Sequence, residues 1–238
     1  MNQLRILSLT IGLALFGAAF AVHAYDEAAV GDGGSVSGAV LFEGTAPERQ
    51  HIEVKAPCEN HDALSEDLIV VKSKDKQFLV NAIVTINEIE KGKAFSKDTP
   101  GLDQKGCVFT PHILVVPAGA DFKMANSDDC NHNIHTHSDL NPESNKAVSP
   151  KSEAKAHFSE PERIAVRCDM HTWMKGWIVV VDNPYYSVTG QDGAFKIDKI
   201  PPGKYKLSVW HETLGEQSKE FTVKAGEDSK LEFSFKSK

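Results

Sequence analysis

The segment from Cys168 to Met174 has the residue types and the spacing of a site for a soft metal ion. It reads Cys168-Asp-Met-His171-Thr-Trp-Met174, so one short loop offers a thiolate, an imidazole and a thioether. Sulfur and imidazole ligands suit copper in both of its oxidation states. Because the three groups share one loop, their mutual distances are nearly fixed, and little has to move when a bound ion gains or loses an electron.

A fourth ligand has to come from another strand. An apolar run from Val108 to Val116 and a turn at 117–119 lead to a strand that ends in Asn126, and His132-Asn133-Ile-His135 follows. An imidazole at His132 would complete a set of one thiolate, two imidazoles and a weak thioether. That set is typical of copper sites that transfer electrons.

Together these two segments resemble the cupredoxin, or blue copper, family. The short Cys-x-x-His-x-x-Met loop is most similar to that of its amicyanin/plastocyanin-like members, and the resemblance covers roughly residues 107–182. It implies a hydrogen-bonding role for Asn133 between the two ligand loops. It also implies one mononuclear type 1 copper, cycling between Cu(II) and Cu(I), whose ligands are His132, Cys168, His171 and Met174.

Two features of the loop depart from the resemblance or leave a choice open. Amicyanin-like loops usually carry a proline beside the histidine, where this chain has Met170 and Thr172, so the stiffness of the loop is in question. Trp173 and Trp177 are expected to flank the site, either as a shield or docking surface around His171 or as ordinary packing.

Four cysteines, at positions 58, 107, 130 and 168, allow several pairings. Cys130 could pair with Cys58 or Cys107, stay free, or join the copper site. The simplest count is a Cys58–Cys107 disulfide with Cys130 free, but a pairing depends on a geometry that the sequence does not contain.

Four further histidines need an interpretation. His135 and His137 are two apart along a predicted strand, so they point to one face. Three interpretations are open for this pair: a second, exposed metal site, a face that loads copper onto the first site, or ordinary surface residues. His112 and His211 are expected to be structural.

The pattern along the chain predicts an all-β fold of Greek-key sandwiches, with many short β-branched runs separated by turn signals. Two polar stretches, Asn87 to Leu102 and Leu140 to Lys155, are expected to be loops. The predicted strands lie at 35–42, 68–71, 78–86, 108–116, 121–125, 133–137, 164–168, 177–181, 194–197, 205–210, 220–223 and 231–235.

The C-terminal part resembles a second family. Its Gln191-Asp-Gly and Pro201-Pro-Gly turns, each followed by a strand, are similar to the transthyretin-like, carboxypeptidase-regulatory-like sandwich. The expected division is N-terminal strands at 35–100 that belong to that sandwich, a copper domain at 104–183 inserted into it, and the rest of the sandwich at 184–238. The alternative is a copper module formed by 35–183 alone, followed by the second sandwich.

The first residues predict export. Arg5 precedes an uncharged apolar run from Ile6 to Val22, and Val22-His-Ala24 offers small residues for cleavage, so residues 1–24 are expected to be a signal peptide. The protein is then expected in the periplasm, or secreted, without a membrane span after cleavage. A retained membrane anchor is the alternative.

Charge and motifs limit the function. The formal net charge of −7 argues against binding to nucleic acid. No nucleophile or metalloprotease motif is present, so the chain is not expected to be an enzyme. We expect the protein to transfer electrons to or from a redox partner protein that the sequence does not identify. The alternatives are a copper carrier or buffer and a non-catalytic binding module. The two modules together resemble bacterial methylamine-utilisation/plastocyanin-like proteins, and this resemblance identifies no partner.

Overall fold

The structure is a computed structural model that describes residues 25–58 and 63–237. The predicted signal peptide at 1–24 lies outside these residues. Every regular element in the described part is a β-strand, so the all-β prediction is confirmed. This part of the chain contains no helix with the length and hydropathy to cross a bilayer.

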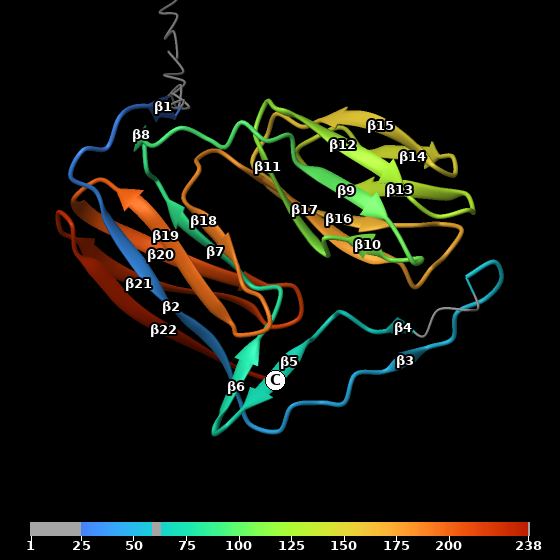
Figure 1. The fold of residues 1–238 in the computed structure, drawn as a ribbon, viewed down its shortest axis with the longest axis horizontal. Helices are drawn as coiled ribbons and strands as arrows, with labels where there is room; N and C mark the ends of the chain where they lie inside the picture. Colours follow the sequence, from blue (N-terminus) through green and yellow to red (C-terminus); the bar gives the residue numbers. More distant parts are fainter. Residues whose placement is uncertain (1–24, 59–62, 238) are drawn as a thin grey trace, which may run out of the picture.

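Strands from the two ends of the chain form one lobe, on the left in Figure 1. Val36, Leu79, Val84, Leu207 and Phe233 are fully buried between its two sheets. One sheet contains β19 (Ala194–Ile200), β2 (Gly34–Glu43), β6 (Lys76–Leu79) and β5 (Val70–Ser73), with β22 (Asp228–Lys236) parallel to β2. The other contains β18 (Tyr186–Val188), β7 (Ile83–Asn87), β20 (Gly203–His211) and β21 (Gly215–Val223).

The predicted Asp-Gly turn lies in this lobe, just before β19. Gly193 has a φ of 60°, and a Cβ on it would lie 2.7 Å from the carbonyl oxygen of Val40. The turn therefore needs glycine both for its backbone conformation and for the close approach of β2.

Strands from the middle of the chain form the second lobe, on the right in Figure 1. Its core includes Phe109, Phe122, Ile134, Ile164 and Ile178. One sheet has the order β11 (Ile113–Pro117), β17 (Lys175–Val181), β16 (Glu162–Arg167), β13 (His132–His137) and β14 (Ser144–Val148). The other has the order β10 (Phe109–Thr110), β9 (Gly101–Gln104), β12 (Asp121–Asn126) and β15 (Ser152–His157).

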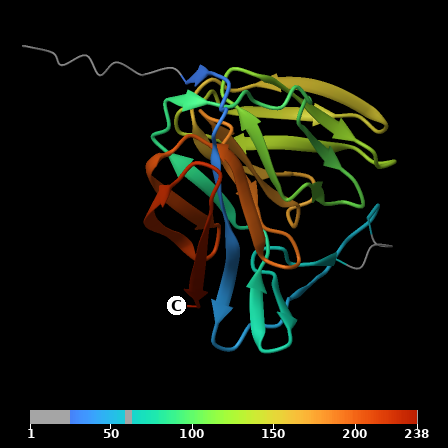
Figure 2. The ribbon, with the colours of Figure 1, turned by 60° about the vertical axis from the view of Figure 1, so that its left-hand side comes forward.

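The two lobes lie side by side in Figure 1 and Figure 2 and share an interface. Its apolar part includes the buried side chains of Ile83, Ile113 and Val179. Trp177 of the second lobe meets Trp210 of the first, with ring centroids 4.9 Å apart.

An arm between β2 and β5 also connects the lobes. It carries the short strands β3 (His51–Ile52) and β4 (Ala63–Leu64) and extends under the second lobe in Figure 1. A Cys58–Cys107 disulfide fastens it there, so the pairing favoured by the cysteine count is present. Near the other end of the first lobe, β1 (Asp26–Glu27) pairs with β8 (Lys91–Gly92).

Two sequence predictions of loops were wrong. The segment 87–102 contains β8 and the start of β9, and the segment 140–155 contains β14 and most of β15. Strands β14 and β15 each lie at the edge of a sheet, and most of their side chains are exposed. A polar edge strand lacks the alternation of apolar residues that would identify it in the sequence.

Candidate metal centre

Three of the four predicted ligands converge in the second lobe. Cys168 follows the end of β16, His171 lies in the loop before β17, and His132 opens β13, the neighbour of β16. The Nδ1 atoms of His132 and His171 lie 2.8 Å apart, and Cys168 Sγ lies 3.7 Å from Nδ1 of His171. The exposed fractions of His132, Cys168 and His171 are 0%, 1% and 5%, so the cluster is shielded from water.

The fourth predicted ligand, Met174, closes the same loop. Its backbone N–H donates to the carbonyl of His171 at 2.8 Å, and its carbonyl accepts from the N–H of Cys168 at 3.4 Å. The Met174 side chain is buried in the core of the second lobe, in the same cluster of apolar residues as Cys168. The loop is therefore a compact turn that holds a thiol, an imidazole and a thioether on one strand connection.

The donor atoms are suited to a single ion. Metal–nitrogen bonds of about 2.0 Å and metal–sulfur bonds of about 2.3 Å separate neighbouring ligand atoms by roughly 3 to 4 Å, which is close to the separations found here. Two imidazole Nδ1 atoms that face each other across 2.8 Å can share only one proton between them. A cation between them satisfies both lone pairs, so the residues present fit a metal ion.

Asp128 prepares His132 for this role and was missed by the sequence analysis. Its Oδ2 atom lies 2.9 Å from Nε2 of His132. Partial burial opposes ionisation of Asp128, but hydrogen bonds from the backbone N–H groups of Cys107 and Gly106 outweigh it and lower the pKa of the carboxyl. An ionised Asp128 holds the proton of His132 on Nε2, which leaves Nδ1 free for a metal. The sequence gives no signal that distinguishes Asp128 from Asp129.

The surroundings of His171 favour its neutral form. Burial and the neighbouring His132 lower the pKa of His171 below its usual range. A neutral imidazole is the form that binds metals, so the environment of His171 favours the ligand form.

Asn133 links the two ligand segments, as the resemblance implied. Its Oδ1 atom accepts hydrogen bonds from the backbone N–H of Asp169 at 2.8 Å and from Cys168 Sγ at 3.3 Å. Its Nδ2 group donates to Asn145 and to Asp169. These contacts fix the position of Cys168 relative to β13.

Cys130 is a free, half-buried thiol next to the cluster. Its Sγ atom lies 3.3 Å from Nε2 of His132, on the side of the ring opposite Nδ1. Burial and the charge of Asp128 raise the pKa of the Cys130 thiol. Cys130 also lies within 4.8 Å of sulfur atoms of the disulfide, but Cys58 and Cys107 have no thiolate to offer while they are bonded to each other.

The two tryptophans expected to flank the site have different surroundings. The ring centroids of Trp173 and His171 lie 5.2 Å apart, and Nε1–H of Trp173 donates to the carbonyl of Cys107. Trp177 instead faces the first lobe and donates to Glu212. The expectation that Trp177 flanks the site is wrong, because alternation along β17 points it into the interface between the lobes.

The remaining histidines fall into two groups. His112 is buried in the interface between the lobes, where it contacts Glu212 and lies 3.5 Å from Glu66, and His211 is fully buried in the first lobe. His135 and His137 lie on one face, as predicted, with ring centroids 4.3 Å apart. They are far less buried than the three converging ligands.

Comparisons with known proteins identify similarities to parts of the chain. A family described as polysaccharide lyase family 4, domain II, matches residues 168–231. No curated protein sequence matches the chain.

Several solved structures are similar in part. A purple cupredoxin from Nitrosopumilus maritimus is 19% identical, with a TM-score of 0.31, and the match covers 35% of this chain and 100% of that one. A reduced amicyanin variant is 20% identical, with a TM-score of 0.33 and coverages of 41% and 98%. A copper-containing nitrite reductase from Thermus scotoductus is 16% identical, with a TM-score of 0.33 and coverages of 60% and 28%. At these TM-scores the interpretation of the site rests on its own geometry.

Proposed function

We propose that this protein transfers electrons through one mononuclear copper held by His132, Cys168, His171 and Met174. The observation that carries the proposal is the convergence of two imidazole Nδ1 atoms and one cysteine sulfur in a buried cluster. Bound copper supplies a one-electron couple between Cu(II) and Cu(I).

Each ligand has a distinct duty. Cys168 gives up its proton when a metal binds and supplies a soft thiolate. His132 and His171 supply neutral nitrogens, and Asp128 fixes the tautomer of His132. Met174, which closes the loop that begins at Cys168, would supply a weak thioether donor to a bound copper.

The surroundings favour electron transfer over catalysis. The ligand loop is tied to β13 through Asn133, and the Cys58–Cys107 disulfide fastens the arm beside it, so the ligands have little freedom to rearrange. Cavities of about 520 and 610 Å³ in the described part of the chain are lined by other residues, and a smaller cavity of about 180 Å³ reaches Trp173 and Lys175 but none of the four proposed ligands. We propose that the protein is not an enzyme.

The edge of His171 is the proposed entry point for the electron. His171 is the most exposed of the three converging ligands, and Met170 next to it is 49% exposed. Trp173 lies beside the His171 ring. An apolar surface around a ligand ring allows a partner protein to approach closely without displacing the ligand.

Burial also favours electron transfer over copper carriage. A carrier has to exchange its ion, which requires ligands that open to a partner, whereas the three converging ligands are at most 5% exposed. Copper carriage or buffering and a non-catalytic binding role remain the alternatives. We propose that the protein acts in the periplasm with a redox partner protein whose identity is open.

The domain division belongs to the same proposal. We assign residues 104–183 to a cupredoxin-like copper domain, and residues 35–100 and 184–238 to a transthyretin-like sandwich into which it is inserted. The pairing of β2 with β19 and β22, and of β7 with β18 and β20, supports this division. The arm at 51–64 is an exception, since Cys58 packs in the core of the second lobe.

The test is to add Cu(II) to the protein that begins at Tyr25 and to record visible absorption and electron paramagnetic resonance. The expected result is one copper per chain with an intense sulfur-to-copper charge-transfer band. The band is lost in Cys168→Ala and retained in Cys130→Ala. A product without that band, or a band that depends on Cys130 and not on Cys168, contradicts the assignment.

Two kinetic measurements then separate the alternatives. Rapid reduction and reoxidation with retention of copper is the expected behaviour of an electron-transfer protein. Facile transfer of copper to an acceptor chelator at a similar rate would favour a carrier and would contradict the proposal.

A further inference from the structure

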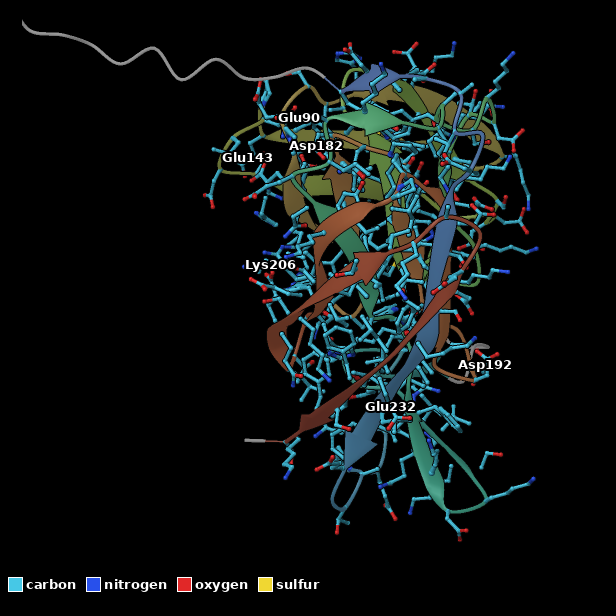
Figure 3. The ribbon with its side chains drawn as sticks, turned by 90° about the vertical axis from the view of Figure 1, so that its left-hand side faces the viewer. Glu90, Glu143, Asp182, Asp192, Lys206 and Glu232 are labelled. Carbon is cyan, nitrogen blue, oxygen red and sulfur yellow. A yellow bond between two sulfur atoms is a disulfide. The ribbon has the colours of Figure 1, made fainter. Side chains whose placement is uncertain are left out.

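A second group of potential metal ligands lies on the surface of the second lobe. His135 and His137 come from β13, and Glu143 lies on the loop that joins β13 to β14. One ligand atom from each of the three lies within 4.8 Å of the others. Figure 3 shows Glu143 at the outer edge of the molecule.

The contacts within this group are specific. Oε1 of Glu143 lies 3.1 Å from Nε2 of His135 and 3.6 Å from Nδ1 of His137. On the other side of its ring, Nδ1 of His135 lies 3.0 Å from Oδ1 of Asp169. His135 therefore presents Nε2 toward Glu143 while a carboxylate holds its other nitrogen, which is a common arrangement for a metal-binding histidine.

The backbone holds these groups together independently of any ion. His135 and His137 share a face because they are two apart on a strand. The loop that carries Glu143 is anchored to β16 because Glu162 accepts hydrogen bonds from Ser138 Oγ at 2.6 Å and from Asn141 Nδ2 at 2.9 Å. The start of β14 is then paired with β13, with Ser144 opposite Thr136.

We propose that His135, His137 and Glu143 form a second, exposed site for a divalent transition-metal ion, with Asp169 positioning His135. Two imidazoles and a carboxylate suit Cu(II), Ni(II) or Zn(II), and Cu(II) is the tightest binder of these in the general order of affinities. The site lacks a thiolate, so it does not favour Cu(I). Its exposure leaves coordination positions for water or an external ligand.

The second site is connected to the buried cluster through Asp169. This residue follows Cys168 in the chain, and its carboxylate accepts hydrogen bonds from Asn133 at 3.1 Å and Asn145 at 2.6 Å. Asn133 in turn contacts Cys168 Sγ. Two side chains, Asp169 and Asn133, therefore connect His135 of the exposed site to the buried thiol, and the two sites share no ligand.

The test is a count of Cu(II) ions by metal analysis and electron paramagnetic resonance on the protein that begins at Tyr25. The expected result is a second ion with nitrogen and oxygen ligands and no charge-transfer band from sulfur. The double variant His135→Ala/His137→Ala should lose this ion, with affinity at least about tenfold weaker, and keep the ion bound by Cys168. His157→Ala is the matched control, because His157 is an exposed histidine on β15 that lies beside Asp121 of β12, outside the group.

A calorimetric titration with Zn(II), on protein loaded with a single equivalent of copper that occupies the buried site, gives a second readout. Zinc should bind the wild type and His157→Ala and should not bind the double variant. Circular dichroism of all variants checks that the surface substitutions leave the fold intact.

The outcomes distinguish the exposed site from the buried site. A second ion that persists in the double variant, or that is lost equally in His157→Ala, overturns the exposed site. A chain with a sulfur-to-copper band and no second ion also overturns it while supporting the buried site. A chain whose only copper has nitrogen and oxygen ligands and is lost in the double variant supports the exposed site and contradicts the proposed electron-transfer function.

Discussion

Oδ1 of Asn133 lies 3.3 Å from Sγ of Cys168, and it also accepts a hydrogen bond from the backbone N–H of the next residue. A side chain that begins on β13 thus holds the cysteine at the end of β16. Since Asn133 follows His132 directly, this contact sets the distance between the two ligand-bearing strands as well as the position of the thiol.

Replacing Asn133 with alanine should destabilise the protein. The substitution leaves buried polar groups without partners, which costs about 1–3 kcal/mol of the free energy of unfolding. Urea unfolding of the metal-free protein measures the loss. Asn131→Ala is the control, because Asn131 is an exposed asparagine outside this hydrogen-bond network, and its effect should be smaller. Equal effects would show that Asn133 has no special role.

Replacing Asp128 with alanine should weaken copper binding without removing a ligand. Without the carboxylate, nothing holds the proton of His132 on Nε2, so Nδ1 is no longer kept free for the metal. Loss of a hydrogen-bond partner of a metal ligand typically lowers metal affinity by about 10- to 100-fold. Competition with a chelator measures the affinity. Asp129→Ala is the matched control, because the Asp129 side chain is 92% exposed and forms an ion pair with the exposed Lys151.

Asp128 also binds two backbone N–H groups, so stability has to be followed in the same samples. An affinity in Asp128→Ala equal to that of Asp129→Ala would contradict the role assigned to Asp128.

Replacing Met174 with leucine should retain copper and raise the reduction potential. Removing a weak thioether donor destabilises Cu(II) more than Cu(I), and the axial ligand is a known determinant of the potential. A redox titration followed by absorption measures the shift. Met124→Leu is the control, since Met124 is buried in the same core on β12. Loss of all copper in Met174→Leu would argue against the role of Met174 as a weak ligand.

The His112–Glu212 pair should make stability depend on pH. Burial opposes protonation of His112, but the carboxylates of Glu212 and Glu66 outweigh it and raise the pKa of His112 to about 9. Because the folded-state pKa lies above the unfolded value of about 6.5, the contribution is complete below pH 6.5 and is lost as the pH rises through 9. Urea unfolding between pH 6 and pH 9.5 measures the decline.

The control for this prediction is His112→Gln, in which that part of the decline should disappear. His211 acts at lower pH and in the opposite sense. Burial lowers its pKa to about 4, so its contribution to stability falls as the pH falls from about 6.5 toward 4. A pH profile unchanged by His112→Gln would contradict the role of the pair.

Local patterns in the sequence predict many of the strands and part of the candidate metal centre. The alternation of apolar residues predicts β2, β13, β16 and β20, because each strand has one face in a core. The turn at Gly193 follows from the backbone conformation that only glycine adopts easily. The spacing of Cys168, His171 and Met174 confines those side chains to one loop, because covalent geometry limits their separation.

Features that depend on distant parts of the chain were accessible only from the folded arrangement. The sequence is compatible with several roles for Cys130. In the folded protein the arm between β2 and β5 brings Cys58 to Cys107, and their disulfide leaves Cys130 as a free thiol beside His132. Asp128 and Asp129 are equivalent in the sequence, and the turn before β13 directs only Asp128 to the ring of His132. Strands β14 and β15 gave no signal, because an edge strand with exposed side chains needs only a neighbour to pair with.

The physical reason for this division is the range of the interactions. Periodicity, turns and the spacing of ligands within one loop act over a few residues and are written in the order of the side chains. The pairing of β2 with β22, the approach of His132 to His171 and the carboxylate that orients His132 depend on chain closure over long distances. Such contacts form only when two packed cores bring those segments together.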